Sequence, residues 1–209
     1  MIDLYTWSTP NGRKVSILLE ELGIDYTVHP IDIGKDEQFA DAFLKIAPNN
    51  KIPAIVDRET GASLFESGAI MIYLADKADR FLPKDGPERY QTLQWLMWQM
   101  GGFGPMLGQA HHFLKYNPGQ APYAEKRFGD ETERLYGVLD RQLADNEYVA
   151  GAYSIADMAI WPWATRYDWQ QIDLAAFPNV VRWFRSVGER PAVQAGYQVP
   201  NPGQVIPSP

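Results

Sequence analysis

The chain has 209 residues, of which 45% are hydrophobic and 22% are charged, so it carries enough apolar side chains to bury a sizeable core. Its 19 basic and 26 acidic residues give a net charge of −7, which argues against nucleic acid or an anionic membrane surface as a partner. It contains no cysteine, which excludes disulfides, cysteine-ligated metals and a cysteine nucleophile. Any thiol chemistry must therefore use the thiol of a ligand.

The first third of the chain alternates strand-like and helix-like patterns. Alternating apolar residues over 2–6 predict a strand, and the helix after it begins at 8–10, where Ser and Thr caps precede a proline. Apolar side chains at i, i+3, i+4 and i+7 indicate one buried face, formed by Val15, Leu18, Leu19 and Leu22. Gly23 is a suitable C-cap, so the helix should end there.

A second strand and a short helix are expected next. The strand covers 26–33 and the helix 36–46, with Pro48 stopping it. In that helix we expect one inward face, composed of Phe39, Phe43 and Ile46.

A β-hairpin follows, with strands over 54–56 and 63–65. Ser67 is the expected N-cap of another helix, which ends near Lys77. The order βαβαββα within residues 1–78 predicts a parallel strand pair followed by an antiparallel hairpin.

Beyond this α/β domain the patterns are helical. Prolines and glycine mark 79–87 as a linker, an all-helical domain covers 88–196, and 197–209 is a proline-rich tail. The fold class is therefore α/β plus all-α.

Two features stand out within the helical domain. An apolar stripe over 93–100 meets a glycine-rich segment over 101–105, which we expect to interrupt and kink the helix. Ser154 and Asp157 have the spacing of a capping box, which predicts a helix start.

The first candidate site is the start of the first helix, Thr-Pro-Asn-Gly at 9–12. Free N–H groups and the helix dipole favour an anion there, and the Thr9 hydroxyl and Asn11 amide are suited to donate hydrogen bonds to a thiolate. An ordinary N-cap is the alternative, and for this segment alone it is the commoner one.

The second candidate is Asn50-Lys51-Ile52-Pro53, ahead of the hairpin. A proline beginning a strand suits a cis peptide bond, and such a turn would leave the Ile52 N–H and C=O to pair with an extended ligand backbone. Lys51 offers a cation for a ligand carboxylate. The alternative is a plain turn with a solvated lysine.

The third candidate is Glu66-Ser67, at the start of the helix after the hairpin. The N-terminal N–H groups there suit a carboxylate, and Glu66 suits an ammonium group, which together match an amino-acid end. The alternative is a capped helix with an exposed glutamate.

Together these segments resemble the glutathione transferase superfamily, whose N-terminal domain is thioredoxin-like and whose C-terminal domain is helical. More narrowly, the motifs at 9–12, 48–55, 64–70 and 104–109 resemble the bacterial nu class, glutathione-dependent disulfide-bond reductases related to a fungal nitrogen-regulating prion protein. The resemblance covers about residues 1–195. It implies a homodimeric enzyme, and the lack of a signal-peptide pattern or a membrane-spanning stretch leads us to expect a cytoplasmic one.

The resemblance also implies the roles of individual residues. Thr9 and Asn11 would lie nearest the glutathione sulfur and replace the catalytic tyrosine, serine or cysteine of other classes. The remaining implied contacts with glutathione are Gln38, Lys51, Ile52, Glu66, Ser67 and Arg127. Ala40 stands where some relatives have a basic residue, so one carboxylate contact is missing.

The expected reaction is reduction of small-molecule disulfides. Without a cysteine, the enzyme must use glutathione for each exchange step, and the resemblance implies two glutathiones or one glutathione disulfide per subunit. Two alternatives stay open. One is conjugation of glutathione to electrophiles, and the other is a binding or regulatory protein that keeps the fold without catalysis.

No metal is expected, because the adjacent His111 and His112 point about 100° apart on a helix. Packing or exposure to solvent explains them more simply than a place in the site. The start of the chain lacks the pattern of a signal peptide, and apolar stretches such as 69–75 are too short to span a bilayer, so no membrane partner is expected.

Overall fold

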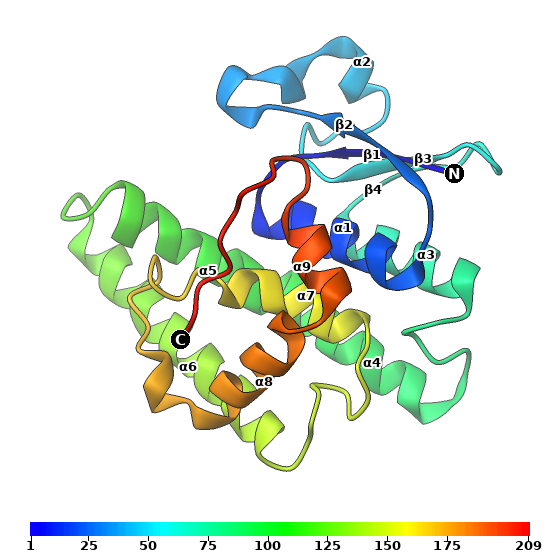
Figure 1. Ribbon diagram of the computed structural model, residues 1–209. Helices are drawn as coiled ribbons and strands as arrows, with labels where there is room; N and C mark the ends of the chain where they lie inside the picture. Colours follow the sequence, from blue (N-terminus) through cyan, green and yellow to red (C-terminus); the bar gives the residue numbers. More distant parts are fainter. The chain divides into compact units, whose positions relative to one another are not determined.

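A mixed sheet with strand order β2-β1-β3-β4 lies at the centre of the first of two units in the computed structural model, which describes residues 1–209 (Figure 1). β1 pairs in parallel with β2 and antiparallel with β3, and β3 pairs antiparallel with β4. The strands are Ile2–Thr6 (β1), Tyr26–Pro30 (β2), Ala54–Asp57 (β3) and Ser63–Phe65 (β4). This confirms the predicted α/β arrangement of a parallel pair followed by a hairpin.

Helix α1, Pro10–Leu22, begins and ends as its sequence predicts. The Thr9 side chain accepts a hydrogen bond from the Gly12 N–H at 3.1 Å, which satisfies one of the free donors of the first turn. Gly23 ends the helix with φ of 65°, a left-handed conformation that glycine adopts without a steric penalty. Val15, Leu18 and Leu19 of the predicted stripe are buried in the core of this unit, whereas Leu22 is half-buried.

Figure 1 shows α1 and α3 (Ser67–Ala78) on one side of the sheet and the short α2 (Asp41–Leu44) on the other. On the α2 side, Phe43, Ala47 and Ala54 form a small buried cluster. Both faces of the sheet are therefore covered within this unit.

The segment before α2 differs from the prediction of one helix over 36–46. It forms two short 3₁₀ turns, Ile33–Lys35 and Glu37–Phe39, separated by Asp36 with φ of 60°. A left-handed residue at this point prevents a continuous helix, so Phe39 falls out of register with Phe43. Phe39 is 56% exposed, and the prediction that it faces inward is wrong.

The cap of α3 also differs from the prediction. Glu66, with φ of 68°, is the N-cap and makes no side-chain cap bond, so Ser67 is the first helical residue. The chain thus turns one residue earlier than the hydroxyl preference of N-caps suggests.

Helix α9, Pro191–Tyr197, packs on α1 and completes the first unit. Ser16 Oγ donates to the Gly196 carbonyl at 2.7 Å, and a Cβ at Gly196 would lie 2.6 Å from Ile17 Cα, so only glycine permits this approach. Arg190 donates to both carboxylate oxygens of Glu21. The unit consists of 1–82 and 189–206, whereas the sequence places 88–196 together in the helical domain.

The second unit, residues 83–188 with 207–209, is all-helical, as predicted. Its α-helices are Gly86–Trp98 (α4), Gly104–Ala110 (α5), Pro122–Ala144 (α6), Ile155–Ala164 (α7) and Pro178–Gly188 (α8). No helix of the chain is both long and apolar enough to cross a membrane.

The expected interruption at 101–105 is wrong, because the chain stays helical from α4 to Tyr116. Pro105 has no N–H and cannot continue the ordinary ladder to the turn before it. The helix widens at Gln99–Phe103 into a π turn, and again at His111–Tyr116, and so continues instead of breaking.

The predicted capping box opens α7. Asp157 is fully buried, and its carboxylate accepts hydrogen bonds from the N–H groups of Val149 and Ser154 and from the Trp183 indole N–H, at 2.9 to 3.0 Å. Burial raises the pKa of Asp157 to about 6, and these hydrogen bonds oppose that rise. Asp157 therefore joins α7, α8 and the loop before α7.

Candidate functional site

Three separate segments of the first unit meet around a cavity of about 60 Å³. Asn11 comes from the first turn of α1, Lys51 and Ile52 from the loop before β3, and Glu66 and Ser67 from the junction of β4 and α3. Five of the eight site residues expected from the sequence thus line one hollow.

The loop before β3 presents its backbone to this cavity. The Ile52–Pro53 peptide bond is cis, as expected at this position. The Ile52 side chain packs against the cluster of Phe43, Ala47 and Ala54, and no backbone hydrogen bond is made by its N–H or C=O. Lys51 is exposed at the rim. An extended ligand backbone could pair with Ile52 here, as a strand pairs with a sheet edge.

The start of α3 forms the opposite wall. The first helical hydrogen bond from this end runs from the Ile70 N–H to the Glu66 carbonyl, so the N–H groups before Ile70 form the positive end of the helix. Glu66 occupies a backbone conformation that non-glycine residues seldom adopt. The N-terminus of α3, which favours an anion, therefore lies beside the Glu66 carboxylate.

Thr9 and Gln38 belong to the same unit but do not line the cavity. Thr9 caps α1 two residues before Asn11. Gln38 lies in the second 3₁₀ turn, where its Nε2 donates to Asp36 Oδ1 at 3.5 Å. The Gln38 Oε1 is buried without a hydrogen-bond partner, which leaves an acceptor for a ligand N–H.

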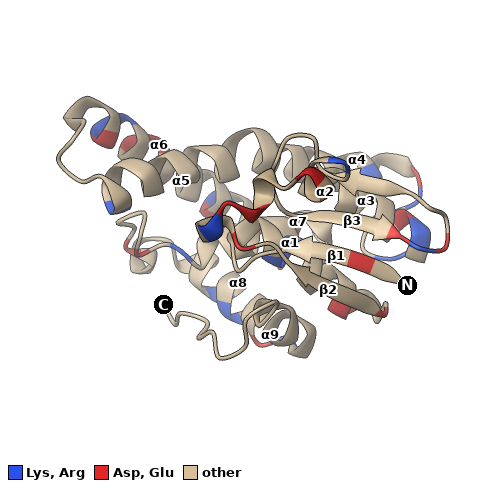
Figure 2. Ribbon diagram, turned by 90° about the horizontal axis from the view of Figure 1, so that it is seen from above, with Lys and Arg blue, Asp and Glu red and all other residues tan.

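Arg127 lies in the second unit, on α6, and lines a different cavity of about 690 Å³. Figure 2 shows both basic and acidic residues along α6. Arg134 donates to both carboxylate oxygens of Glu131 at 2.7 and 2.8 Å. The predicted contact of Arg127 with glutathione stays a prediction.

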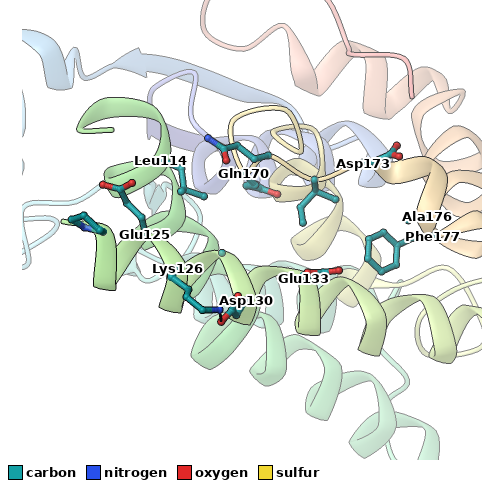
Figure 3. A pocket seen from close by; sticks show the side chains of 13 residues that line it. Leu114, Glu125, Lys126, Asp130, Glu133, Gln170, Asp173, Ala176 and Phe177 are labelled. Carbon is teal, nitrogen blue, oxygen red and sulfur yellow. Dashed lines mark hydrogen bonds and ion pairs between the residues drawn. The ribbon is translucent and has the colours of Figure 1, made fainter. Parts of the chain in front are cut away.

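A third cavity, of about 560 Å³, lies beside α6 in the second unit (Figure 3). Its lining combines Glu125, Asp130 and Glu133 with one cation, Lys126, which pairs with Asp130 at 2.7 Å. Gln170, the buried amide at this cavity, is already bonded, because its Oε1 accepts from Tyr136 and its Nε2 donates to Trp163. This cavity is therefore larger than the one in the first unit, and acidic side chains predominate among its charged lining residues.

His111 is part of the same interior network. Its Nε2 lies 3.0 Å from the Gln170 Nε2, and its ring stacks on Trp163. Burial, together with the nearby Arg166 charge, lowers the pKa of His111 to about 4. The ring is therefore neutral and accepts a hydrogen bond from Gln170. His111 packs in the core, whereas His112 is exposed.

Lys14 is a residue of the site that the sequence analysis missed. Its side chain is buried on α1, 1% exposed, and its Nζ donates to Ser67 Oγ at 3.4 Å. Burial lowers the pKa of Lys14 to about 7, and the Glu66 carboxylate opposes that change. The signal in the sequence was its spacing, because Lys14 stands three residues after Asn11 and so lies on the same helix face.

Known families account for both units. The model of the glutathione S-transferase N-terminal domain matches residues 1–76, and the model of the C-terminal domain matches residues 103–191. The chain belongs to the glutathione S-transferase family. This membership confirms the superfamily, fold and enzyme class that the motifs predicted.

Two relatives and two solved structures place the chain within the glutathione S-transferases. It is 51% identical over 198 residues to disulfide-bond oxidoreductase YfcG of Escherichia coli, covering 92% of each chain. It is 44% identical over 212 residues to disulfide-bond oxidoreductase YghU of the same organism, covering 93% of this chain and 73% of that one.

The solved structures are glutathione transferases from two Pseudomonas species. The Pseudomonas putida enzyme, with one glutathione disulfide bound per subunit, matches with a TM-score of 0.90 and 44% identity, over 95% of this chain and 91% of that one. The Pseudomonas fluorescens protein, with two glutathione bound, matches with a TM-score of 0.89 and 42% identity, over 95% and 93%.

Proposed function

We propose that this chain is a glutathione-dependent disulfide-bond reductase that uses bound glutathione in place of a cysteine of its own. The observation that carries the proposal is the convergence of Asn11, Lys51, Ile52, Glu66 and Ser67 on one cavity in a chain without cysteine. The relatives named disulfide-bond oxidoreductases and the glutathione-bound neighbours support it.

The cavity has the polarity for one end of glutathione, because carboxylate, ammonium, hydroxyl and amide side chains line it. The α3 N-terminus with Ser67 would hold the γ-glutamyl carboxylate, and Glu66 would hold its ammonium group. Ile52 would pair with the peptide backbone, and Lys51 and Gln38 would add polar contacts.

The start of α1 would stabilise the glutathione thiolate. The Thr9 oxygen accepts from the Gly12 N–H, so the Thr9 hydroxyl hydrogen points away from the helix and is a donor. Asn11, two residues further along the chain, would add an amide donor, and the helix dipole favours the anion. Each unit by which the thiol pKa falls corresponds to about 1.4 kcal/mol.

The reaction then consists of two thiol–disulfide exchanges. The thiolate of one glutathione attacks the substrate disulfide, forms a mixed disulfide and releases a substrate thiolate. The thiolate of a second glutathione attacks the glutathione sulfur of the mixed disulfide, so that glutathione disulfide forms and the second substrate thiolate leaves. The two leaving thiolates take up the protons that the two glutathione thiols gave up.

The resemblance supplies three further parts of the proposal. They are a homodimeric assembly, membership of the nu class and the contact of Arg127 described next, and the sequence patterns add a cytoplasmic location. Arg127 would reach glutathione from the helical unit in that arrangement.

Thr9→Ala tests the proposal, with Thr9→Ser as the matched control. Turnover of a small disulfide with glutathione is followed as NADPH loss with glutathione reductase, beside an aryl halide conjugation assay. We expect disulfide turnover by the wild type, at least a tenfold loss of kcat in Thr9→Ala, and near wild-type kcat in Thr9→Ser. Conjugation without disulfide turnover would favour a general transferase, and no turnover by folded wild type would favour a binding protein.

A further inference from the structure

Lys14 lies directly beneath the polar wall of the cavity. Asn11 and Lys14 are one turn apart on the same face of α1, and Asn11 lines the cavity while Lys14 is buried behind it. The Lys14 ammonium donates to the hydroxyl of Ser67, the first residue of α3. Lys14 therefore connects the helix of the expected thiolate site with the helix of the expected carboxylate site.

A lysine is seldom buried to this extent, because removing an ammonium group from water has a large free-energy cost. Packing alone does not require the charge, since a methionine fills a similar volume without it. The Glu66 carboxylate is the charged group that favours the ammonium form, and Glu66 itself lines the cavity. Glu66 thus opposes the loss of the Lys14 proton that burial favours, at the cavity where a ligand carboxylate is expected.

The hydrogen bond also fixes the direction of the Ser67 hydroxyl. Because Ser67 Oγ accepts from the Lys14 ammonium, the hydroxyl hydrogen points away from Lys14. A hydroxyl that accepts from an ammonium group is a stronger donor, so a carboxylate that enters the cavity and accepts a hydrogen bond from the Ser67 hydroxyl is bound more tightly.

We propose that Lys14 is a positioning residue that orients the Ser67 hydroxyl and makes this cavity selective for thiols that carry the free α-carboxylate of a γ-glutamyl group. The inference rests on the proposed function and names a determinant within the same site. Lys14 acts through Ser67 and the local potential, and it takes no part in the exchange of sulfur atoms.

The neighbouring residue provides a matched control. Arg13 is also a buried cation of α1, but its Nε donates to the Tyr197 carbonyl and its guanidinium lies 3.5 Å from the centre of the Tyr197 ring. Arg13→Met therefore removes a buried charge of the same helix on the α9 side. We expect it to lower stability and to leave ligand affinity within about twofold.

The test is titration calorimetry with two ligands that lack a free thiol. One is S-methylglutathione, and the other is the same molecule with 4-aminobutyryl in place of γ-glutamyl, which removes only the α-carboxylate. We expect Lys14→Met to bind S-methylglutathione at least tenfold more weakly than the wild type does. Its affinity for the analogue should equal that of the wild type within about twofold. With glutathione as substrate, KM should rise in parallel while kcat stays within about threefold.

A double-mutant comparison identifies the route through Ser67. In a Ser67→Ala background, Lys14→Met should cause less than half of its loss in binding free energy, because the hydroxyl that it orients is gone. Circular dichroism checks that each variant is folded. Lys14→Gln, which keeps an N–H donor without the charge, replaces Lys14→Met if the latter does not fold.

Equal losses for both ligands, or wild-type affinity in a folded Lys14→Met, would overturn the inference while leaving the proposed function intact. Failure of the wild type to bind S-methylglutathione would overturn the proposed function and the inference with it. The two failures are therefore distinguished by the wild type alone.

Discussion

In each unit of this protein a buried ionisable side chain lies beside the start of a helix: Lys14 in the first unit and Asp157 in the second. Burial moves both pKa values toward neutrality, to about 7 for Lys14 and about 6 for Asp157. The surroundings differ. Asp157 accepts from the Val149 and Ser154 backbone and from Trp183, all within the core, whereas Lys14 contacts Ser67 at a cavity.

This difference separates a buried charged group that connects elements of the fold from one that lies beside a cavity. The bonds of Asp157 are satisfied by groups of its own unit, so the carboxylate joins elements of the fold. Lys14 donates to Ser67, which lines a cavity, and this placement is the basis for the proposed action of the ammonium group on a ligand. The degree of burial alone does not distinguish the two; the direction of the partners does.

The largest effect that we expect is the loss of stability caused by the substitution Asp157→Ala. Without the Asp157 carboxylate, the N–H groups of Val149 and Ser154 and the Trp183 indole N–H lose their hydrogen-bond acceptor. Each buried donor left without an acceptor lowers the free energy of unfolding by about 1–3 kcal/mol. We expect the free energy of unfolding in urea to fall by roughly 3–5 kcal/mol.

The control is Asp173→Ala, an exposed carboxylate that accepts only from the Ala175 N–H at 3.0 Å. It should cost about 1 kcal/mol or less. Similar losses in the two variants would show that the buried network of Asp157 does not hold the helical unit together.

The second effect is the pH dependence of stability that Lys14 confers. Its pKa falls from 10.5 to about 7 on folding, so between these values the unfolded chain binds more protons than the folded one. The unfolding free energy of the wild type should therefore rise relative to Lys14→Met as pH increases from 7, by up to about 1.4 kcal/mol per unit.

Urea titrations of both proteins at pH 7, 8 and 9 measure this difference. A difference that stays flat over the range would mean that Lys14 is not desolvated as the structure indicates.

The smallest effect is expected for Lys51→Met, the exposed cation at the rim of the same cavity. Exposed charges are screened by salt and contribute about 0.2–1 kcal/mol. We expect KM for glutathione to rise about two- to threefold at low ionic strength and the difference to vanish in about 1 M salt, where the Debye length is roughly 3 Å. The effect of Lys14→Met should persist in that salt, and equal salt sensitivity of the two would remove the contrast between them.

The parts of this fold that follow from local chemistry are visible in the sequence. The cap by Thr9, the stop at Gly23, the hairpin and the capping box of Asp157 all depend on residues within a few positions of one another. Segments 9–12, 50–53 and 66–67 carried enough of that chemistry to predict the site, and the structure brings five of the eight residues to one cavity.

The features that the sequence did not show depend on contacts from distant parts of the chain or on a backbone state without a clear residue signature. Phe39 is exposed because left-handed Asp36 resets the helix register. Pro105 suggested a break, but a π turn accommodates the missing N–H. The sequence analysis did not single out Lys14, and only the packing of α1 on α3 shows that it is buried.

The first unit contains residues from both ends of the chain, because α9, residues 191–197, packs on α1. On the ribosome, the strands and helices of residues 1–82 emerge long before their last partner is made. At about 5–20 residues per second, synthesis of residues 83–188 takes roughly ten seconds. During that time the face of α1 that binds α9 is not yet covered. The half of the molecule that carries the site is therefore begun first during translation and finished last.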